Sequence, residues 1–365
     1  MLPLLLALSC SKPTSYQNGD SSLFSMEDVA KMISELPLSQ EHLDEVFDAV
    51  NSSSGNGYDE EYMMKSLFST PGAGVGDSGT KAAGRYKTPM RDLMKDYLAS
   101  KYSRTKAGAA DVQKYIDSLS ESDMQIYWPY SEYWDGEEFP IVTFDPGQGA
   151  TSNYGYELRM VDGGLKVVDS VLVTEQVAKD RPVWVINKND DSSFTPFEPD
   201  TRAATKAQGG RVLTLKSFKM LRNYDSWFAG ASEFYVQFGA VDGFRATSDE
   251  DLKKYAPTIT DFIIVVKRSQ LGLEIPFNSI LLTDFTDQME SFAMLITEDD
   301  GGTTTSWKSS ANVRYKSKTY GFDIEIPYKD KDDVVWRGQL SGSFLSERDE
   351  VTGRFGDVAI TFALE

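Results

Sequence analysis

The sequence has one cysteine, Cys10, and one histidine, His42, among its 365 residues. A single cysteine forms no internal disulfide, so the folded core alone must supply the stability of the chain. His42 lies among acidic residues at helical spacing, where we expect an exposed side chain with no catalytic task. These scarcities exclude Ser-His-Asp hydrolases, His-Glu-x-x-His metalloproteases and Cys-His nucleophiles, and they disfavour a zinc site.

Long hydrophobic runs and basic residues are also scarce. Beyond the N-terminus, no run approaches the roughly 18 apolar residues that span a bilayer. The chain has 37 basic and 56 acidic side chains and a net charge of −19, which disfavours binding to nucleic acids and to acidic lipid headgroups. We interpret the excess carboxylates as a solubility feature, with attraction of divalent cations as the alternative. An aromatic content of 12% argues against a disordered chain.

The first ten residues form an apolar run that ends in Ala-Leu-Ser before Cys10. This segment resembles the lipobox of bacterial lipoproteins, and the resemblance implies cleavage before Cys10 and diacylation of its sulfur. The basic stretch of a secretory signal is missing, so we expect it upstream of Met1. Residues 1–21 are therefore predicted to be a signal and polar tether, with the protein lipid-anchored in the cell envelope, at the outer membrane. The alternative is an ordinary apolar N-terminus with a buried cysteine.

The rest of the chain divides by its hydrophobic periodicity. Apolar residues at helical spacing predict a helical domain over 22–123, and period-two alternation predicts a small β domain over 124–191. Residues 192–210 read as a linker, and alternation from 211 to 365 predicts a β-sandwich. The predicted fold class is α+β multidomain, with a helical domain followed by mainly antiparallel β domains.

Aromatic and acidic residues are concentrated between residues 127 and 138. Aromatic faces there could stack on sugar rings beside carboxylates, and two carboxylates suffice for glycoside hydrolysis. The alternative is that these aromatics pack the junction between helices and strands. The candidate ligand-binding residues are Trp128, Tyr130, Glu132, Trp134 and Asp135.

The C-terminal region has the order strand, acidic turn, glycine, strand over residues 220–236, followed by acidic segments ending at Asp284 and after Leu295. This order resembles the C-two type β-sandwich over about 100 residues, which implies calcium held by carboxylates on loops at one end. Glu233-Phe-Tyr-Val stands where that family has Asp-Pro-Tyr-Val, so the calcium site departs from the pattern. Acidic hairpin turns without metal are the alternative. The candidate ligands are Asp225, Glu233, Asp299 and Asp300.

Together these features predict a membrane-anchored lipoprotein that acts as a non-catalytic binding or adhesion module. The lipobox and the β-rich body resemble large surface lipoproteins of gut-type Bacteroidota, which implies a location more than an activity. Its partners would be the membrane, through the lipid, and a protein or glycan, but no nucleic acid. Two alternatives stay open: a glycan-binding protein or carboxylate-based glycoside hydrolase, and a calcium-stabilised sandwich that binds lipid or protein.

Overall fold

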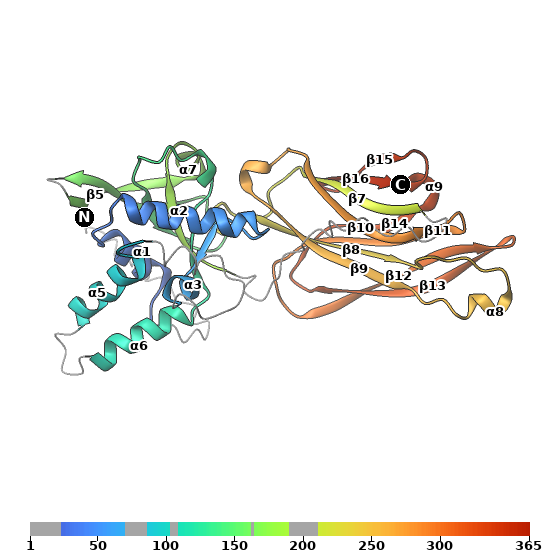
Figure 1. Cartoon of the computed structure of the whole chain (residues 1–365), viewed down its shortest axis with the longest axis horizontal. Coiled ribbons are helices and arrows are strands. Elements are labelled where there is room, and N and C mark those ends of the chain that lie inside the picture. Colours follow the sequence, from blue (N-terminus) through green and yellow to red (C-terminus); the bar gives the residue numbers. More distant parts are fainter. Residues whose placement is uncertain (1–22, 70–85, 103–108, 162–163, 190–210) are drawn as a thin grey trace, which may run out of the picture.

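The structure, a computed structural model, describes residues 23–69, 86–102, 109–161, 164–189 and 211–365, which form two adjoining units (Figure 1). The predicted signal and tether with Cys10, and the predicted linker, lie outside the described residues. Within the described residues, no helix is long and apolar enough to cross a membrane.

The N-terminal unit combines helices with a mixed sheet. Its helices are α1 (Met26–Ser34), α2 (Gln40–Gly55), α3 (Met64–Phe68), α5 (Met90–Tyr102), α6 (Ala109–Ser120), the 3-10 turn η1 (Ser131–Tyr133) and α7 (Glu175–Asp180). Its strands are β1 (Glu61–Met63), β2 (Met124–Tyr127), β3 (Ile141–Phe144), β4 (Ser152–Val161), β5 (Gly164–Thr174) and β6 (Val183–Lys188). The strand order is β1-β2-β6-β3-β4-β5, with β3 and β6 parallel and the other pairs antiparallel.

One hydrophobic core joins these helices to the sheet. Val29 and Ile33 of α1 belong to the same buried cluster as Trp184 and Ile186 of β6. The separate helical domain predicted over 22–123 is therefore not confirmed, because its helices bury their apolar faces against strands from the region predicted as a small β domain. The structure has a single mixed α+β unit there.

His42 also differs from its prediction. Its side chain is 4% exposed, and its Nδ1 accepts the backbone N–H of Ser39 at 2.9 Å at the start of α2. Burial lowers the pKa of the imidazole. His42 thus has a capping role in the core, and burial keeps the ring neutral.

The C-terminal unit is built almost entirely from strands. They are β7 (Arg211–Met220), β8 (Ser232–Ala240), β9 (Thr258–Val266), β10 (Ile275–Phe285), β11 (Met289–Glu298), β12 (Thr304–Tyr315), β13 (Lys318–Lys329), β14 (Asp333–Ser341), β15 (Glu350–Phe355) and β16 (Val358–Leu364). The short helical pieces are α8 (Asp249–Leu252), η2 (Arg268–Gln270) and α9 (Gly342–Leu345).

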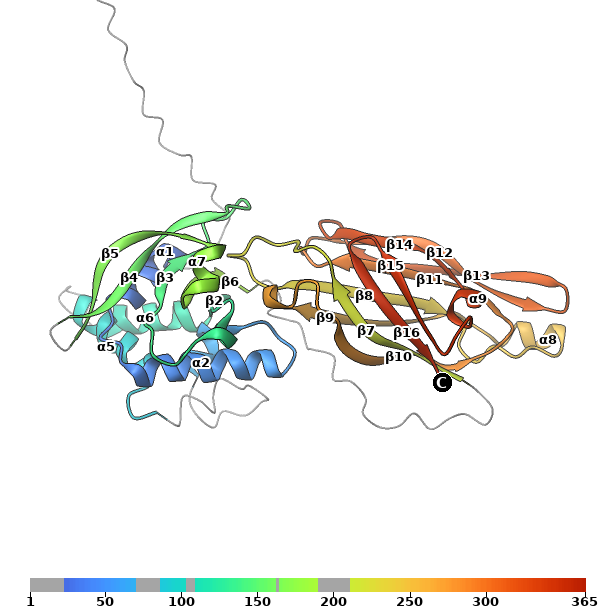
Figure 2. The same ribbon diagram turned by 90° about the horizontal axis from the view of Figure 1, so that it is seen from above.

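These strands form two sheets that share one core (Figure 2). One sheet has the order β10-β7-β16-β15, and the other has β13-β12-β11-β8-β9 with β14 paired to β11. Phe218 of the first sheet lies 5.0 Å from Phe234 of the second, measured between ring centroids, so the inner faces interdigitate. The arrangement is sandwich-like and antiparallel, in agreement with the predicted β-rich C-terminal region.

Candidate functional site

The loop between β7 and β8 connects the two units. Trp227 and Phe228 on this loop are buried in a cluster with Tyr127, Ile141 and other residues of the N-terminal sheet. The indole N–H of Trp227 donates to the carbonyl of Thr151 at 3.0 Å. The face of the sheet opposite the main helices is thus covered by α7 and by this loop of the sandwich.

Polar groups reinforce the same contact. The Oδ2 of Asp59 accepts the backbone N–H of Ala231 at 2.9 Å, and Asn187 donates to the carbonyl of Phe228 at 3.1 Å. Burial raises the pKa of Asp59, and the hydrogen bonds from the backbone N–H groups of Ala231 and Glu60 oppose the increase. Each unit therefore satisfies buried polar groups of the other, which fixes the loop in place.

Arg268 adds a buried ion pair to this junction. It is the first residue of η2, two residues after the end of β9, and is 7% exposed. Its Nε lies 3.0 Å from the Oε1 of Glu175 on α7, and its guanidinium also donates to the carbonyl of Asp225 at 3.1 Å. The hydroxyl of Tyr130 donates to the same Glu175 oxygen at 2.7 Å. One arginine of the sandwich thus binds both the N-terminal unit and the β7–β8 loop.

A pair of carboxyl groups, Glu60 and Glu132, lies near Lys267, the residue before this arginine. The two side chains hydrogen-bond each other, which requires one of them to hold a proton. Burial raises the pKa of Glu60 well above its ordinary value. Ser131 donates its hydroxyl to the Glu60 Oε1 at 2.8 Å, and the Lys267 Nζ is 3.9 Å from the same oxygen. Because the Glu60 side chain is fully buried, we interpret the pair as part of the junction.

A second acidic cluster occupies the end of the sandwich that faces this junction. One ligand oxygen from each of Asp225, Glu233 and Glu298 lies within 4.8 Å of the others. Asp225 is on the β7–β8 loop, Glu233 is in β8, and Glu298 is the last residue of β11. The antiparallel pairing of β8 with β11 places Glu298 opposite Phe234, the residue after Glu233.

Glu298 is the most deeply buried carboxylate of the cluster. Its side chain is 1% exposed, and its Oε1 accepts no hydrogen bond from an N–H or hydroxyl group of the described residues. Burial, then the hydrogen bond and charge of Asp225, and then the charge of Asp300, raise the pKa of Glu298 from 4.5 to about 11. Without a cation, this carboxyl is therefore protonated at neutral pH.

The structure brings together only part of the predicted ligand set. Asp225 and Glu233 converge as predicted, whereas both carboxylate oxygens of Asp299 bind the Nζ of Lys329, at 2.7 and 2.8 Å. Asp300 acts on Glu298 through its charge and donates its backbone N–H to Asp332. Asp299 therefore lies outside the cluster, and its carboxylate is paired with the ammonium group of Lys329.

The cluster of Asp225, Glu233 and Glu298 suits a hard divalent cation. Calcium binds oxygen ligands at about 2.3–2.6 Å, so two ligands of one ion lie within roughly 5 Å of each other. The three carboxylates meet this limit. Backbone carbonyls and water would complete the six to eight ligands that calcium normally takes. A bound ion would also give the unpartnered Oε1 of Glu298 a partner and favour its ionised form.

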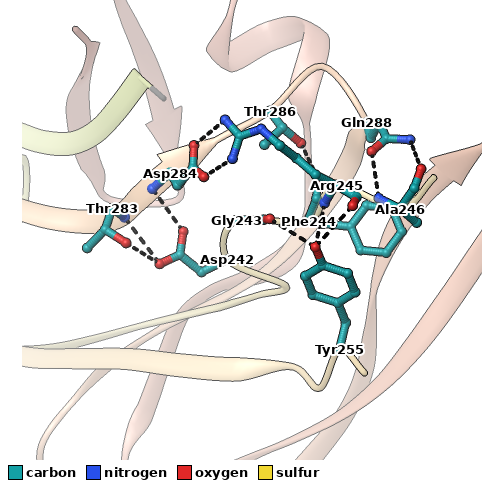
Figure 3. Close-up of polar contacts among 10 residues, drawn as sticks. All are labelled: Asp242, Gly243, Phe244, Arg245, Ala246, Tyr255, Thr283, Asp284, Thr286 and Gln288. Atoms are coloured by element: carbon teal, nitrogen blue, oxygen red, sulfur yellow. Dashed lines mark hydrogen bonds and ion pairs between the residues drawn. The ribbon is translucent and has the colours of Figure 1, made fainter. Parts of the chain in front are cut away.

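The acids at the opposite end of the sandwich have a different environment (Figure 3). Asp242 accepts the hydroxyl of Thr283 at 2.6 Å and the backbone N–H of Asp284 at 3.0 Å. The carboxylate of Asp284 forms a two-pronged pair with the guanidinium of Arg245. Protein donors thus satisfy these carboxylates, so only the junction end combines clustered acids with an unpartnered buried oxygen among the described residues.

The predicted glycan-binding aromatics pack inside the protein. Trp128 is 1% exposed and its ring contacts Phe47, Trp134 and Trp184, with centroids 5.1 to 5.8 Å apart. Tyr130 is 5% exposed. Their ring faces are covered by other side chains, so the prediction of an open sugar-stacking surface is corrected to a packed core and junction.

The two predicted acids of the same segment lie apart from each other. Glu132 pairs with Glu60, whereas Asp135 is exposed and its Oδ1 accepts the backbone N–H groups of Glu137 and Glu138 at 2.9 and 3.2 Å. These backbone bonds lower the pKa of Asp135. Asp135 therefore has the role of a turn-forming residue.

Comparison with known proteins identifies no relative: no family model, no curated protein and no solved structure matches the chain. Function is therefore inferred from the carboxylate clusters and their surroundings.

Proposed function

We propose that this chain is a non-catalytic binding protein of the bacterial cell envelope whose C-terminal sandwich is stabilised by calcium. The ion would be held by Asp225, Glu233 and Glu298. The observation that carries the proposal is the convergence of these three carboxylates around a buried oxygen that lacks a protein donor. The resemblance to C-two type sandwiches, with acidic loops at one end, supports the same choice of ion.

Calcium at this position would act on the junction as well as on the sandwich. Asp225 belongs to the loop whose Trp227 and Phe228 pack into the N-terminal sheet, and its carbonyl accepts a hydrogen bond from Arg268. Fixing the Asp225 carboxylate therefore fixes the loop that joins the two units. A rigid two-unit body suits a binding module, because little conformational entropy is lost when it meets its partner.

Thermal unfolding in calcium and in chelator tests the proposal. An ion at about 100 times its dissociation constant stabilises the folded state by about 2.7 kcal/mol, which for a domain of this size raises the melting temperature by roughly 5–10 °C. We expect Glu233→Gln to lose most of this increase. Asp242→Asn, a matched change at the other end of the sandwich, should retain it. Equal melting temperatures in calcium and chelator for the wild-type chain would contradict the proposal.

The envelope location depends on Cys10, and the lipobox resemblance supports it. If Cys10 carries the lipid, the protein expressed in a bacterium with its secretion signal will be recovered with membranes and will incorporate a labelled fatty acid. Cys10→Ala should abolish both. Incorporation of label into the alanine variant would refute anchoring at this residue.

A further inference from the structure

The outer edge of the N-terminal sheet is unusually apolar for an exposed strand. β5 ends the strand order, and among the described strands it pairs only with β4. Residues 166–170 of β5 are exposed in succession. Five of the eleven exposed large hydrophobic side chains of the described residues belong to the β4–β5 hairpin: Tyr154, Met160, Val167, Val168 and Leu172. An open strand edge beside an apolar strip is a site for adding another strand.

A β-bulge in this hairpin arranges the charges of the edge. β4 pairs Glu157 with Asp169 and Leu158 with Val167, so Val168 is the extra residue. Residues opposite each other in adjacent strands share a face, so Asp169 lies on the face of Glu157, and Lys166 on that of its partner Arg159. Arg159 and Glu157 share one face, since they form an ion pair at 3.0 Å.

Consequently, Lys166 and Asp169 also share one face of β5, and each stands opposite a residue of its own sign in β4. Like charges directly opposite each other are unfavourable in a sheet. An antiparallel neighbour on the open side of β5 is favoured when it offers a negative group to Lys166 and a positive group to Asp169.

We propose that this neighbour is β5 of a second copy of the chain. A two-fold axis that passes perpendicular to the sheet between Val167 and Val168 makes the two β5 strands antiparallel. It places Lys166 of each copy opposite Asp169 of the other, and Val167 opposite Val168. The bulge keeps both charged residues on the same face, which the two-fold axis requires. The edge is therefore complementary to itself in charge and in apolar content, and two copies would form one continuous sheet.

Sedimentation equilibrium of the full chain, with reductant to keep Cys10 from linking copies, tests the proposal. We expect a monomer–dimer equilibrium that weakens with added salt, because exposed ion pairs are screened. Lys166→Glu places like charges across both symmetry-related pairs and should weaken dimerisation at least tenfold. The double variant Lys166→Glu/Asp169→Lys restores opposite charges and should recover most of the affinity. Lys253→Glu makes the same charge change on the exposed surface of the sandwich and should leave the equilibrium unchanged.

Three results would overturn the proposal. The first is a wild-type chain that stays monomeric at every concentration, and the second is a dimer that Lys166→Glu does not weaken. The third is a double variant that associates no better than the single one. Because the three substituted side chains are exposed, each variant should melt like the wild type, and this is checked in the same samples. The outcome is independent of the calcium site, which lies in the other unit.

Discussion

Replacing Glu298 with glutamine separates the cost of the buried carboxyl from its use in binding a cation. The folded state raises the pKa of Glu298 from 4.5 to about 11, so at pH 7 without calcium the folded chain holds a proton that the unfolded chain releases. At about 1.4 kcal/mol per pH unit, the roughly 2.5 pH units between 4.5 and 7 lower the free energy of unfolding by at most about 3.5 kcal/mol. Glutamine matches the shape of the protonated acid and releases no proton, so Glu298→Gln should recover much of this stability.

The sign of the pH dependence follows from the direction of the pKa change. A carboxyl with a raised pKa in the folded state contributes stability that is fully present below its unfolded value, 4.5 for Glu298, and is lost as the pH rises toward about 11. The wild type and Glu298→Gln should therefore have similar stability near pH 4. Above that pH, the variant should become progressively more stable than the wild type in chelator. In calcium at neutral pH, the wild type should be the more stable of the two. The ion replaces the proton on Glu298, whereas the uncharged glutamine side chain binds the ion more weakly.

Urea unfolding at a series of pH values, in chelator and in calcium, measures these differences directly. The midpoint shift at constant slope gives the change in the free energy of unfolding. Parallel pH curves for the wild type and Glu298→Gln in chelator would refute the raised pKa. A variant that gains as much stability from calcium as the wild type would refute the role of Glu298 as a ligand.

Three further substitutions test the junction, each measured by urea unfolding. Trp227→Ala removes a nearly buried indole that fills the N-terminal cluster, and it should cost about 3–5 kcal/mol; a loss below about 1 kcal/mol would argue against a packed junction. Arg268→Met removes a buried guanidinium from the Glu175 carboxylate, which is 29% exposed and keeps Tyr130 and Lys179 as partners, so it should cost about 1–3 kcal/mol, whereas an unchanged midpoint would show that the pair is not formed. Gly230→Ala should cost more than about 1 kcal/mol, because its φ is +150° and an added Cβ would lie 2.9 Å from the Asp59 carboxylate; a neutral effect would contradict this geometry.

Alternating hydrophobicity located most of the sandwich strands, because their inner residues are buried on one face. The alternation predicts strands over 212–220, 232–238 and 260–267, and β7, β8 and β9 lie within two residues of these bounds. β15 was missed, since only Val351 and Phe355 of this edge strand are buried and Gly353 interrupts its pattern. The alternation predicts strands over 311–315 and 321–326, but β12 and β13 are longer, because backbone pairing continues through exposed polar residues that carry no hydrophobic signal.

The helical segments were recognised from their periodicity, but their packing partners were not. A helix with one apolar face needs a surface to cover, and the sequence does not say whether that surface is another helix or a sheet. Here α1 shares its core with Trp184 and Ile186, which lie some 150 residues later in the chain. Such non-local contacts decide the domain boundaries, and the spacing of apolar residues within one segment does not reveal them.

The candidate cation site was partly predictable for a related reason. Asp225 and Glu233 were identified from an acidic turn followed by a strand, and they converge. The choice among the consecutive acids from 298 to 300 depends on which face of β11 each side chain takes. Glu298 continues the inward face of Met294 and Ile296, whereas Asp299 meets Lys329. The sequence feature that identifies Glu298 is an acidic residue at an inward-facing position of a buried strand.

Isothermal titration of the full chain with calcium tests the central claim most directly. We expect one saturable site per chain in the wild type, strong weakening in Glu298→Gln and Glu233→Gln, and unchanged binding in Asp242→Asn. Because the ion displaces the Glu298 proton, the heat should also vary with the ionisation enthalpy of the buffer, to the extent of about one proton released per ion bound at neutral pH. An absence of saturable binding in the wild type, or equal binding in all four proteins, would contradict the assignment of the cluster as a calcium site.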